Sequence, residues 1–306
     1  MQNYEKFVEI FTVQTAAVYG LDTSDSYFDC TNFYFEIDRE DDFRKKGPSK
    51  ENKKEPIIGL GLLLDRNQIP VGMKMYPGNV SEKPILRDVI DGLKNRNNIT
   101  GKTIHVADKG LNCAQNIAFS KQNGDGYLFS KSVKTLPSTE KTWVLSEQDY
   151  KDVKDKRNDF GEAGKYVDFT DKTGNKAKTR MNRAAIDKDL ALAGYNLLVT
   201  SETQMTDQDI YCTYHNLWRI EESFKIMKSD LDARPVFLQK ENTIKGHFLI
   251  CYLTVLLERI FQFKILDEKY SISDIFRFIK DFRVTKGEHK YINTIFDYKR
   301  NYSVPR

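Results

Sequence analysis

Short apolar runs in the first third of the chain have the pattern of buried β-strands. The segment SYFDCTNFYFEI, residues 26–37, is dense in aromatic and β-branched side chains, as expected of a strand that is buried on both faces. Two further apolar runs, residues 57–65 and 70–77, are separated by RNQI and predict a hairpin. A weak helical period over residues 4–18 predicts a helix before the first strand.

The pattern then alternates between helix and strand. Residues 86–95 and 111–122 have the apolar spacing of helices, whereas residues 103–108 and 126–130 are typical of short buried strands. Three strands followed by helix, strand, helix and strand is the order of a ribonuclease-H-like core, with a meander first and crossover connections later. We therefore predict an α/β fold in which a mixed sheet is flanked by helices.

The chain becomes polar and charged after residue 130, which indicates an insertion of short strands and exposed loops before the final helices. Residues 194–200 return to a strand pattern, and helices dominate afterwards, over residues 207–230, 241–264 and 273–281. We expect four segments: the first part of the ribonuclease-H-like core over residues 1–130, a β-rich insertion over 131–192, the rest of the core over 193–264, and a C-terminal helical tail over 265–306.

The composition is that of a globular chain without a membrane span. Of its 306 residues, 40% are hydrophobic and 30% charged. The longest apolar run, residues 248–257, has about half of the ~20 residues that a bilayer span needs, so it predicts a buried helix. The N-terminus lacks the pattern of a signal peptide, which favours a cytoplasmic location. We expect the four widely spaced cysteines to be reduced core residues: Cys30, Cys113, Cys212 and Cys251.

The net charge of +4 is too small to identify a partner, but one segment is strongly basic. RKKGPSKENKK, residues 44–54, has six basic residues and one acid. It is either a solvated loop or a site of contact with nucleic-acid phosphates. In the second case, Lys50, Lys53 and Lys54 would contact DNA.

Two aspartates stand out in the strand pattern. Asp29 lies within an apolar strand, where an ionised carboxylate requires a cation or hydrogen-bond donors. Asp108 ends a short strand, the usual place for functional groups in α/β sheets. For either residue alone, a turn or capping role is the simpler interpretation. If the fourth strand pairs parallel with the first, however, the two carboxylates meet although they are 79 positions apart.

A helix near residue 220 carries two adjacent glutamates that its apolar stripe distinguishes. At about 100° per residue, Glu222 points away from the stripe and is expected to face water. Glu221 lies nearer to the stripe, on the same side as Tyr214 and Lys228. The stripe consists of Leu217, Ile220, Phe224, Met227 and Leu231.

Three carboxylates on two strands and a helix suit hard cations, which prefer oxygen ligands. Asp29, Asp108 and Glu221 could hold two Mg²⁺ or Mn²⁺ ions about 3.5–4 Å apart and activate a water or a DNA 3′-hydroxyl for attack on a phosphodiester. Lys228 and Tyr214 could contact DNA phosphates, or could cover the core stripe with their apolar parts.

The assembled pattern resembles DDE transposases of the insertion-sequence-four superfamily of bacterial elements. Their signature Y-x2-R-x3-E-x6-K is matched at Tyr214, Glu221 and Lys228, while Leu217 occupies the arginine position. Arg219 or His215 could supply the missing phosphate contact.

The two family aspartates resemble Asp29 in FDCTNFYFE and Asp108 in VADKGLNCAQN, where Asn116 is also in place. The turn YPGNVSE and the segment RPVFLQKENTIKGHFLICYL are further family-like pieces, so the likeness covers roughly residues 20–262.

This resemblance implies a catalytic triad of Asp29, Asp108 and Glu221 that binds Mg²⁺ or Mn²⁺, with two ions expected. It also implies cleavage at the ends of a mobile element and joining to target DNA by a homodimer or higher oligomer. Family members usually carry a sizeable N-terminal DNA-binding region, whereas about 25 residues precede the first catalytic strand here, so we expect a truncated chain. The alternatives are an inactive remnant that binds DNA or a transposase, and a ribonuclease-H-like nuclease that does not join ends.

Overall fold

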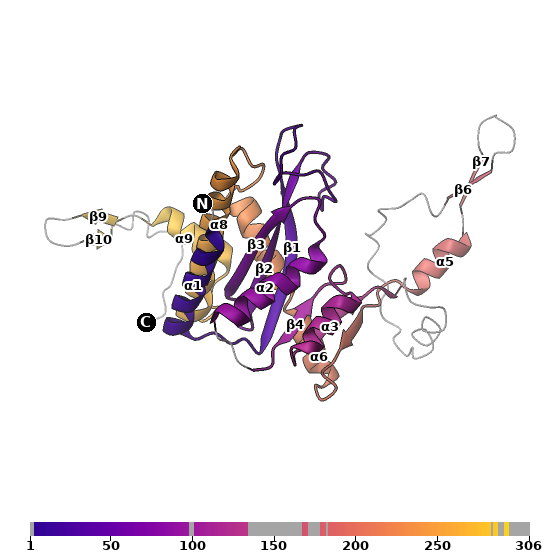
Figure 1. Ribbon diagram of the computed structural model, residues 1–306, viewed down its shortest axis with the longest axis horizontal. Helices are drawn as coiled ribbons and strands as arrows, with labels where there is room; N and C mark the ends of the chain where they lie inside the picture. Colours follow the sequence, from indigo (N-terminus) through magenta and orange to yellow (C-terminus); the bar gives the residue numbers. More distant parts are fainter. Residues whose placement is uncertain are drawn as a thin grey trace, which may run out of the picture.

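A six-stranded mixed sheet forms the centre of the molecule in the computed structural model (Figure 1). The structure describes residues 3–97, 101–133, 167–170, 178–181, 183–282, 284–286 and 291–293. The strand order is β3-β2-β1-β4-β5-β8. The strands are β1 (Asp25–Tyr34), β2 (Ile57–Asp65), β3 (Pro70–Pro77), β4 (Ile104–Ala107), β5 (Gly126–Lys131) and β8 (Leu197–Thr200).

The pairing of the first five strands is the one predicted from their order in the sequence. The first three strands form an antiparallel meander, whereas β4 pairs parallel with β1 and β5 parallel with β4. The last strand, β8, is antiparallel to β5. The fold is therefore α/β and ribonuclease-H-like, with a mixed sheet flanked by helices.

Helices cover both faces of this sheet. One apolar core joins it to α1, α7 and α8, and a second core joins it to α2 and α3. In Figure 1, α1 runs beside the edge strand β3 and α2 crosses in front of the sheet. The helices are α1 (Tyr4–Tyr19), α2 (Glu82–Asn97), α3 (Ala114–Gln122), α6 (Asp207–His215), α7 (Trp218–Lys225), α8 (Glu241–Ile260) and α9 (Ile272–Asp281). Two π-helical turns, η3 (Ile226–Asp230) and η4 (Phe261–Ile265), continue α7 and α8.

The central strand β1 is buried on both faces, as its composition predicted. Its odd-numbered Tyr27 and Phe33 belong to the core under α7 and α8, whereas Phe28 and Cys30 belong to the core under α2. Because side chains alternate along a strand, Asp29 shares the face of Tyr27 and Phe33. The sequence of β1 thus directs this carboxylate toward α7.

The insertion and the C-terminal tail are described only in part. Within residues 131–192, β6 (Val167–Thr170) and β7 (Lys178–Met181) pair antiparallel and α5 (Arg183–Ala191) follows, while residues 134–166, 171–177 and 182 lie outside the described residues. Figure 1 shows these elements beside the sheet, not in it. The segment boundaries at residues 130, 192 and 264 stay predictions.

The segment predicted as a helical tail contains a strand pair as well as the helix α9. After α9, the segments β9 (Val284–Lys286) and β10 (Tyr291–Asn293) form an antiparallel pair. Both segments contain β-branched or aromatic residues, which favour strands. Residues 294–306 lie outside the described residues.

The prediction for the cysteines is right for two residues and wrong for two. Cys30 and Cys251 are buried, but Cys113 is partly exposed and Cys212 is exposed, and all four are free thiols. Cys113 precedes the first turn of α3, and α6, which carries Cys212, has no buried residue.

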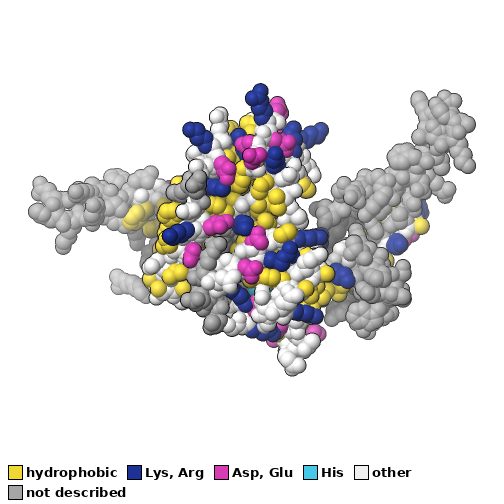
Figure 2. Space-filling model, in the orientation of Figure 1, with side chains coloured by type: hydrophobic (Ala, Val, Ile, Leu, Met, Phe, Trp, Pro, Cys, Tyr) yellow, Lys and Arg dark blue, Asp and Glu magenta, His cyan; other side chains and the backbone are white. Residues whose placement is uncertain are grey.

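Charge and apolarity are distributed without a single dominant patch on the face seen in Figure 2. Basic and acidic side chains are interspersed there, which agrees with the small net charge. Among the described helices, none combines the length and apolar character needed to cross a bilayer.

Candidate active site

The three carboxylates singled out in the sequence line one cavity. Asp29, Asp108 and Glu221 all border a hollow of ≈ 610 Å³. The hollow lies between β1, the end of β4, and the wall formed by α6, α7 and η3. Four cationic residues line the same space as the three acids: Lys50, Lys225, Lys228 and Arg234.

The two aspartates meet because of the parallel register of β1 and β4. Phe28 pairs with Ala107, and Asp29 and Asp108 are each the next residue along. A strand pairing between segments far apart in sequence therefore brings the two carboxyl groups to one edge of the cavity, as predicted.

The two adjacent glutamates of α7 have different partners. Glu221 is exposed and lines the cavity. Glu222 was predicted to face water. Instead, its carboxylate accepts a hydrogen bond of 2.9 Å from the buried guanidinium of Arg259 on α8. The prediction failed because Ser223 and Ile226 are also buried, which widens the core face toward Glu222. The two glutamates border this face on opposite sides.

Asp29 is a largely buried carboxylate with a cation beside it. Burial raises its pKa to about 6, the Lys50 ammonium counteracts this rise, and Glu82 and Asp108 reinforce it. The distance from Lys50 Nζ to Asp29 Oδ1 is 3.5 Å. At neutral pH Asp29 is therefore ionised, and Lys50 neutralises it.

Lys50 is held in place from several directions. Its ammonium group donates to the backbone oxygen of Cys30 and lies 3.7 Å from Glu82 Oε1. The loop that carries it packs closely on the end of β3: a Cβ atom on Gly47 would lie 1.9 Å from the backbone oxygen of Gly78. Only glycine allows this approach, so Gly47 fixes the path by which the loop delivers Lys50 to Asp29.

Asp108 is oriented by two hydroxyl groups. Ser130 Oγ donates to Asp108 Oδ1 at 2.9 Å, and the Tyr214 hydroxyl donates to the same oxygen at 3.4 Å. Burial raises the pKa of Tyr214 to about 12, so its hydroxyl keeps its proton and acts as a donor. Tyr214 is thus part of the carboxylate cluster.

Lys228 and Arg234 converge on the carboxylate of Glu51. Lys228 Nζ donates to Glu51 Oε1 at 3.0 Å, and Arg234 Nη1 donates to the same oxygen. Burial lowers the pKa of Lys228, and Glu51 counteracts this effect. Lys228 also lies over the ring of Phe33, 5.5 Å from its centroid.

Three other residues predicted to contact DNA do not line the cavity: Arg219, Lys53 and Lys54. Arg219 pairs with Glu268 and lies over the ring of Trp218. Lys53 lies 4.5 Å from the centroid of Tyr34, and Lys54 is exposed. The DNA contacts of these residues stay predictions.

The donor set suits a hard divalent cation, because the cavity presents carboxylate oxygens from three elements. The ammonium group of Lys50 now stands where a cation would neutralise Asp29. Within the described part of the chain, no three His, Cys, Asp or Glu side chains are already grouped closely enough to hold a metal ion.

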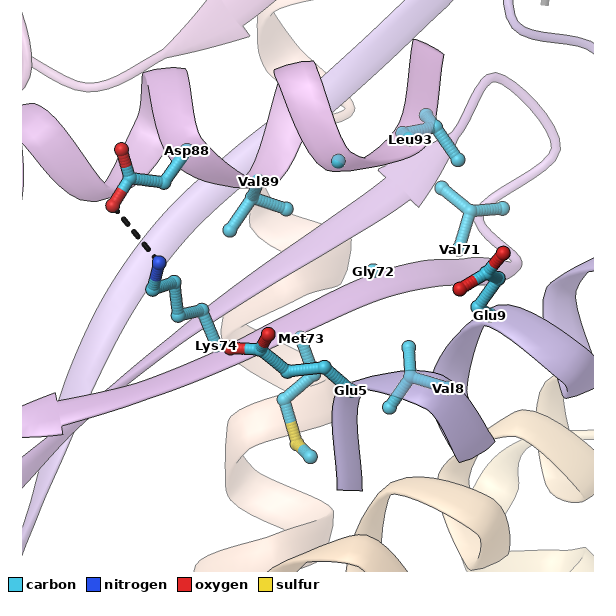
Figure 3. A pocket seen from close by; sticks show the side chains of 11 residues that line it. Glu5, Val8, Glu9, Val71, Gly72, Met73, Lys74, Asp88, Val89 and Leu93 are labelled. Carbon is cyan, nitrogen blue, oxygen red and sulfur yellow. Dashed lines mark hydrogen bonds and ion pairs between the residues drawn. The ribbon is translucent and has the colours of Figure 1, made fainter. Parts of the chain in front are cut away.

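A second, much smaller pocket has a different character (Figure 3). It encloses ≈ 60 Å³ between α1, β3 and α2. Its floor is apolar, and Lys74 and Asp88 pair across its rim at 2.9 Å. Glu5 and Glu9 of α1 also line this pocket.

Sequence reasoning missed Glu51 and Arg234 as members of the site. Glu51 is the one acid in the basic segment, which was the available signal for an internal ion pair. Arg234 lies in the family-like segment that begins with RPVF, but nothing local indicated its partner.

One family model matches the part of the chain that carries the three carboxylates. The family model described as "Transposase DDE domain" matches residues 29–257, more than half of the chain. No match was found among curated proteins. Among solved structures, the chain is similar to a piggyBac transposase in a synaptic complex with hairpin DNA, with 10% identity and a TM-score of 0.46 over 85% of this chain. The match covers 52% of that transposase chain, so this chain spans about half of its length.

Proposed function

The chain belongs to the family of transposases with a DDE domain, and on this premise we propose that it is a metal-dependent DNA transposase. Its reaction would cut at the ends of an insertion sequence and join the 3′ ends to target DNA by phosphoryl transfer. The observation that supports this proposal best is the cavity that Asp29, Asp108 and Glu221 line together with four cationic residues.

Asp29, Asp108 and Glu221 would hold the divalent ions, Mg²⁺ or Mn²⁺, with two expected. Bound there, such ions lower the pKa of a water or 3′-hydroxyl and stabilise the leaving oxygen of a phosphodiester. The hydroxyl groups of Ser130 and Tyr214 hold Asp108 in a fixed orientation. Lys50 keeps Asp29 ionised and has to withdraw when a stronger cation binds that carboxylate.

Membership of the insertion-sequence-four superfamily is a finer proposal. Tyr214, Glu221 and Lys228, the three residues that match its signature, line the same cavity. The fourth position, Leu217, also lines the cavity and is buried, so it contributes an apolar surface there.

DNA is the proposed partner. Lys50, Lys53, Lys54 and Arg219 would contact its phosphates at or near the site, together with Lys228 and Tyr214. Cutting both ends of an element and joining them to one target requires two active sites, so we propose a homodimer or higher oligomer on DNA.

The test is a cutting and joining assay with the purified chain. The substrate is a duplex that carries the DNA flanking the element's coding sequence, and a second duplex serves as target. We expect cation-dependent cutting and 3′-end joining, both lost on chelation and in the Asp29→Asn and Asp108→Asn variants. Cutting without joining would favour the nuclease alternative, and DNA binding without cutting would favour the inactive one.

A further inference from the structure

Glu51 occupies a small anion site that two cations form on the wall of the cavity. Its Oε1 atom accepts hydrogen bonds from both Lys228 and Arg234. We propose that Lys228 and Arg234 together bind a backbone phosphate of DNA, and that the Glu51 carboxylate fills their site until DNA displaces it. This inference rests on the proposed function, because it takes DNA as the ligand.

The folded core fixes the positions from which the two cations extend, although the side chain of Arg234 is itself 32% exposed. Lys228 belongs to η3, and its side chain is only 12% exposed. The backbone on either side of Arg234 is fixed, because Ala233 N donates to Met227 O at 3.1 Å and Val236 N donates to Tyr34 O at 3.0 Å. The two donors are therefore preorganised and keep their positions whichever anion lies between them.

The anion, by contrast, comes from the loop between β1 and β2. Glu51 lies far from both cations in sequence, 177 positions from Lys228 and 183 from Arg234. Burial alone would raise the pKa of Glu51, but the two cations hold it below its usual value. A phosphate in place of this loop carboxylate would keep both cations paired, so the exchange leaves no charge uncompensated.

The rest of the cavity explains why this site is suited to DNA. Arg234 and Lys228 line the same hollow as the three carboxylates, so an anion bound between them lies beside the proposed reaction centre. Leu217 and Phe224 line the adjoining surface of α7 with apolar side chains. A planar guanidinium and an ammonium group directed at one point form a common arrangement for phosphate oxygens.

An internal competitor and a simple structural salt bridge give opposite predictions. If Glu51 competes with phosphate, Glu51→Gln tightens DNA binding; if the pair only tethers the loop, loss of the charge weakens binding or leaves it unchanged. The matched control is Asp42→Asn, which removes the same charge from an exposed position in the same loop.

The experiment is fluorescence anisotropy of a short labelled DNA duplex with the full chain, over a series of salt concentrations. We expect Glu51→Gln to bind about fivefold more tightly than Asp42→Asn, as loss of a competing ion pair of ~1 kcal/mol predicts. Arg234→Gln should remove about one phosphate contact. The slope of the logarithm of the binding constant against the logarithm of the salt concentration should then become shallower by ~0.9. Arg234→Lys should keep most of that slope.

A double-mutant cycle decides the outcome. The gain from Glu51→Gln should shrink in the Arg234→Gln background, because only Lys228 is then left to be unmasked. Equal binding by Glu51→Gln and Asp42→Asn, or a gain of undiminished size without Arg234, would overturn the anion site while leaving the proposed function intact. No DNA binding by the unsubstituted chain would overturn both.

Discussion

The buried guanidinium of Arg259 makes Glu222 a structural residue, and this assignment can be tested by Glu222→Gln. Arg259 has no exposed side-chain surface. Its guanidinium donates to Glu222 Oε2 and to Gln262 Oε1, each at 2.9 Å. Its other acceptors are neutral, the hydroxyl of Ser223 and the backbone oxygen of Arg219. The substitution therefore keeps the shape of the side chain but removes the neutralising charge.

Two features of the structure set the size of the effect. Breaking one side of a buried ion pair costs about 3–5 kcal/mol, because the remaining charge is left without compensation. Glu222 is 26% exposed, so solvent screens part of the interaction. The nearby Glu258 carboxyl can also ionise in its place once Glu222 is neutral. We therefore expect Glu222→Gln to lower the free energy of unfolding by about 2–3 kcal/mol.

The assay is denaturant unfolding near neutral pH, with Glu221→Gln as the matched control. Glu221 is exposed, so its substitution should change the free energy of unfolding by less than about 0.5 kcal/mol. The comparison is valid when the free energy of unfolding falls with denaturant concentration at the same slope in all three proteins. A Glu222→Gln variant as stable as the unsubstituted chain, or a less stable Glu221→Gln variant, would refute the reasoning.

Three further predictions concern stability. Gly47→Ala should lower the free energy of unfolding by about 1–3 kcal/mol in denaturant titrations, since its Cβ atom would overlap the backbone of Gly78. Gly246→Ala should raise it by about 0.5–1 kcal/mol in the same measurement, because a Cβ there meets nothing within 4 Å and alanine favours the α8 helix. Burial raises the pKa of Glu258 from 4.5 to about 7, so its carboxyl group holds a proton more tightly in the folded state than in the unfolded state. Ionisation of this group therefore destabilises the folded state increasingly as the pH rises from 4.5 to 7. Relative to the unsubstituted chain, Glu258→Gln should therefore gain about 2–3 kcal/mol between pH 4.5 and pH 8, and a constant difference over that range would contradict this assignment.

The sheet and its carboxylates could be predicted because their signals are local. The apolar runs of β2 and β3 mark both strands at their observed bounds. The order of elements then requires a parallel pairing of β1 with β4, which places Asp29 beside Asp108. The apolar stripe placed Glu221 at the cavity, but it gave the wrong environment for Glu222, since it omitted the buried Ser223 and Ile226.

The electrostatic partners of the site could not be predicted because they depend on distant segments. Glu51 reaches Lys228 and Arg234 only after its loop has folded back on the sheet, and no periodic pattern encodes such a contact. The close approach of Gly47 to Gly78 also joins two separate segments of the chain, and no periodic pattern encodes it. The basic loop is thus partly an internal ion-pair network, which its composition alone could not distinguish from a solvated or DNA-binding loop.

The most direct test of the central claim compares cation-dependent DNA cutting by Glu221→Gln and Glu222→Gln. The two variants remove the same charge from adjacent positions of one helix. At a temperature where both are folded, Glu221→Gln should reduce the cutting rate by about a thousandfold or more, whereas Glu222→Gln should stay near the rate of the unsubstituted chain. Equal activity of Glu221→Gln and the unsubstituted chain, or loss of cutting only in folded Glu222→Gln, would contradict the assignment of Asp29, Asp108 and Glu221 as the catalytic carboxylates.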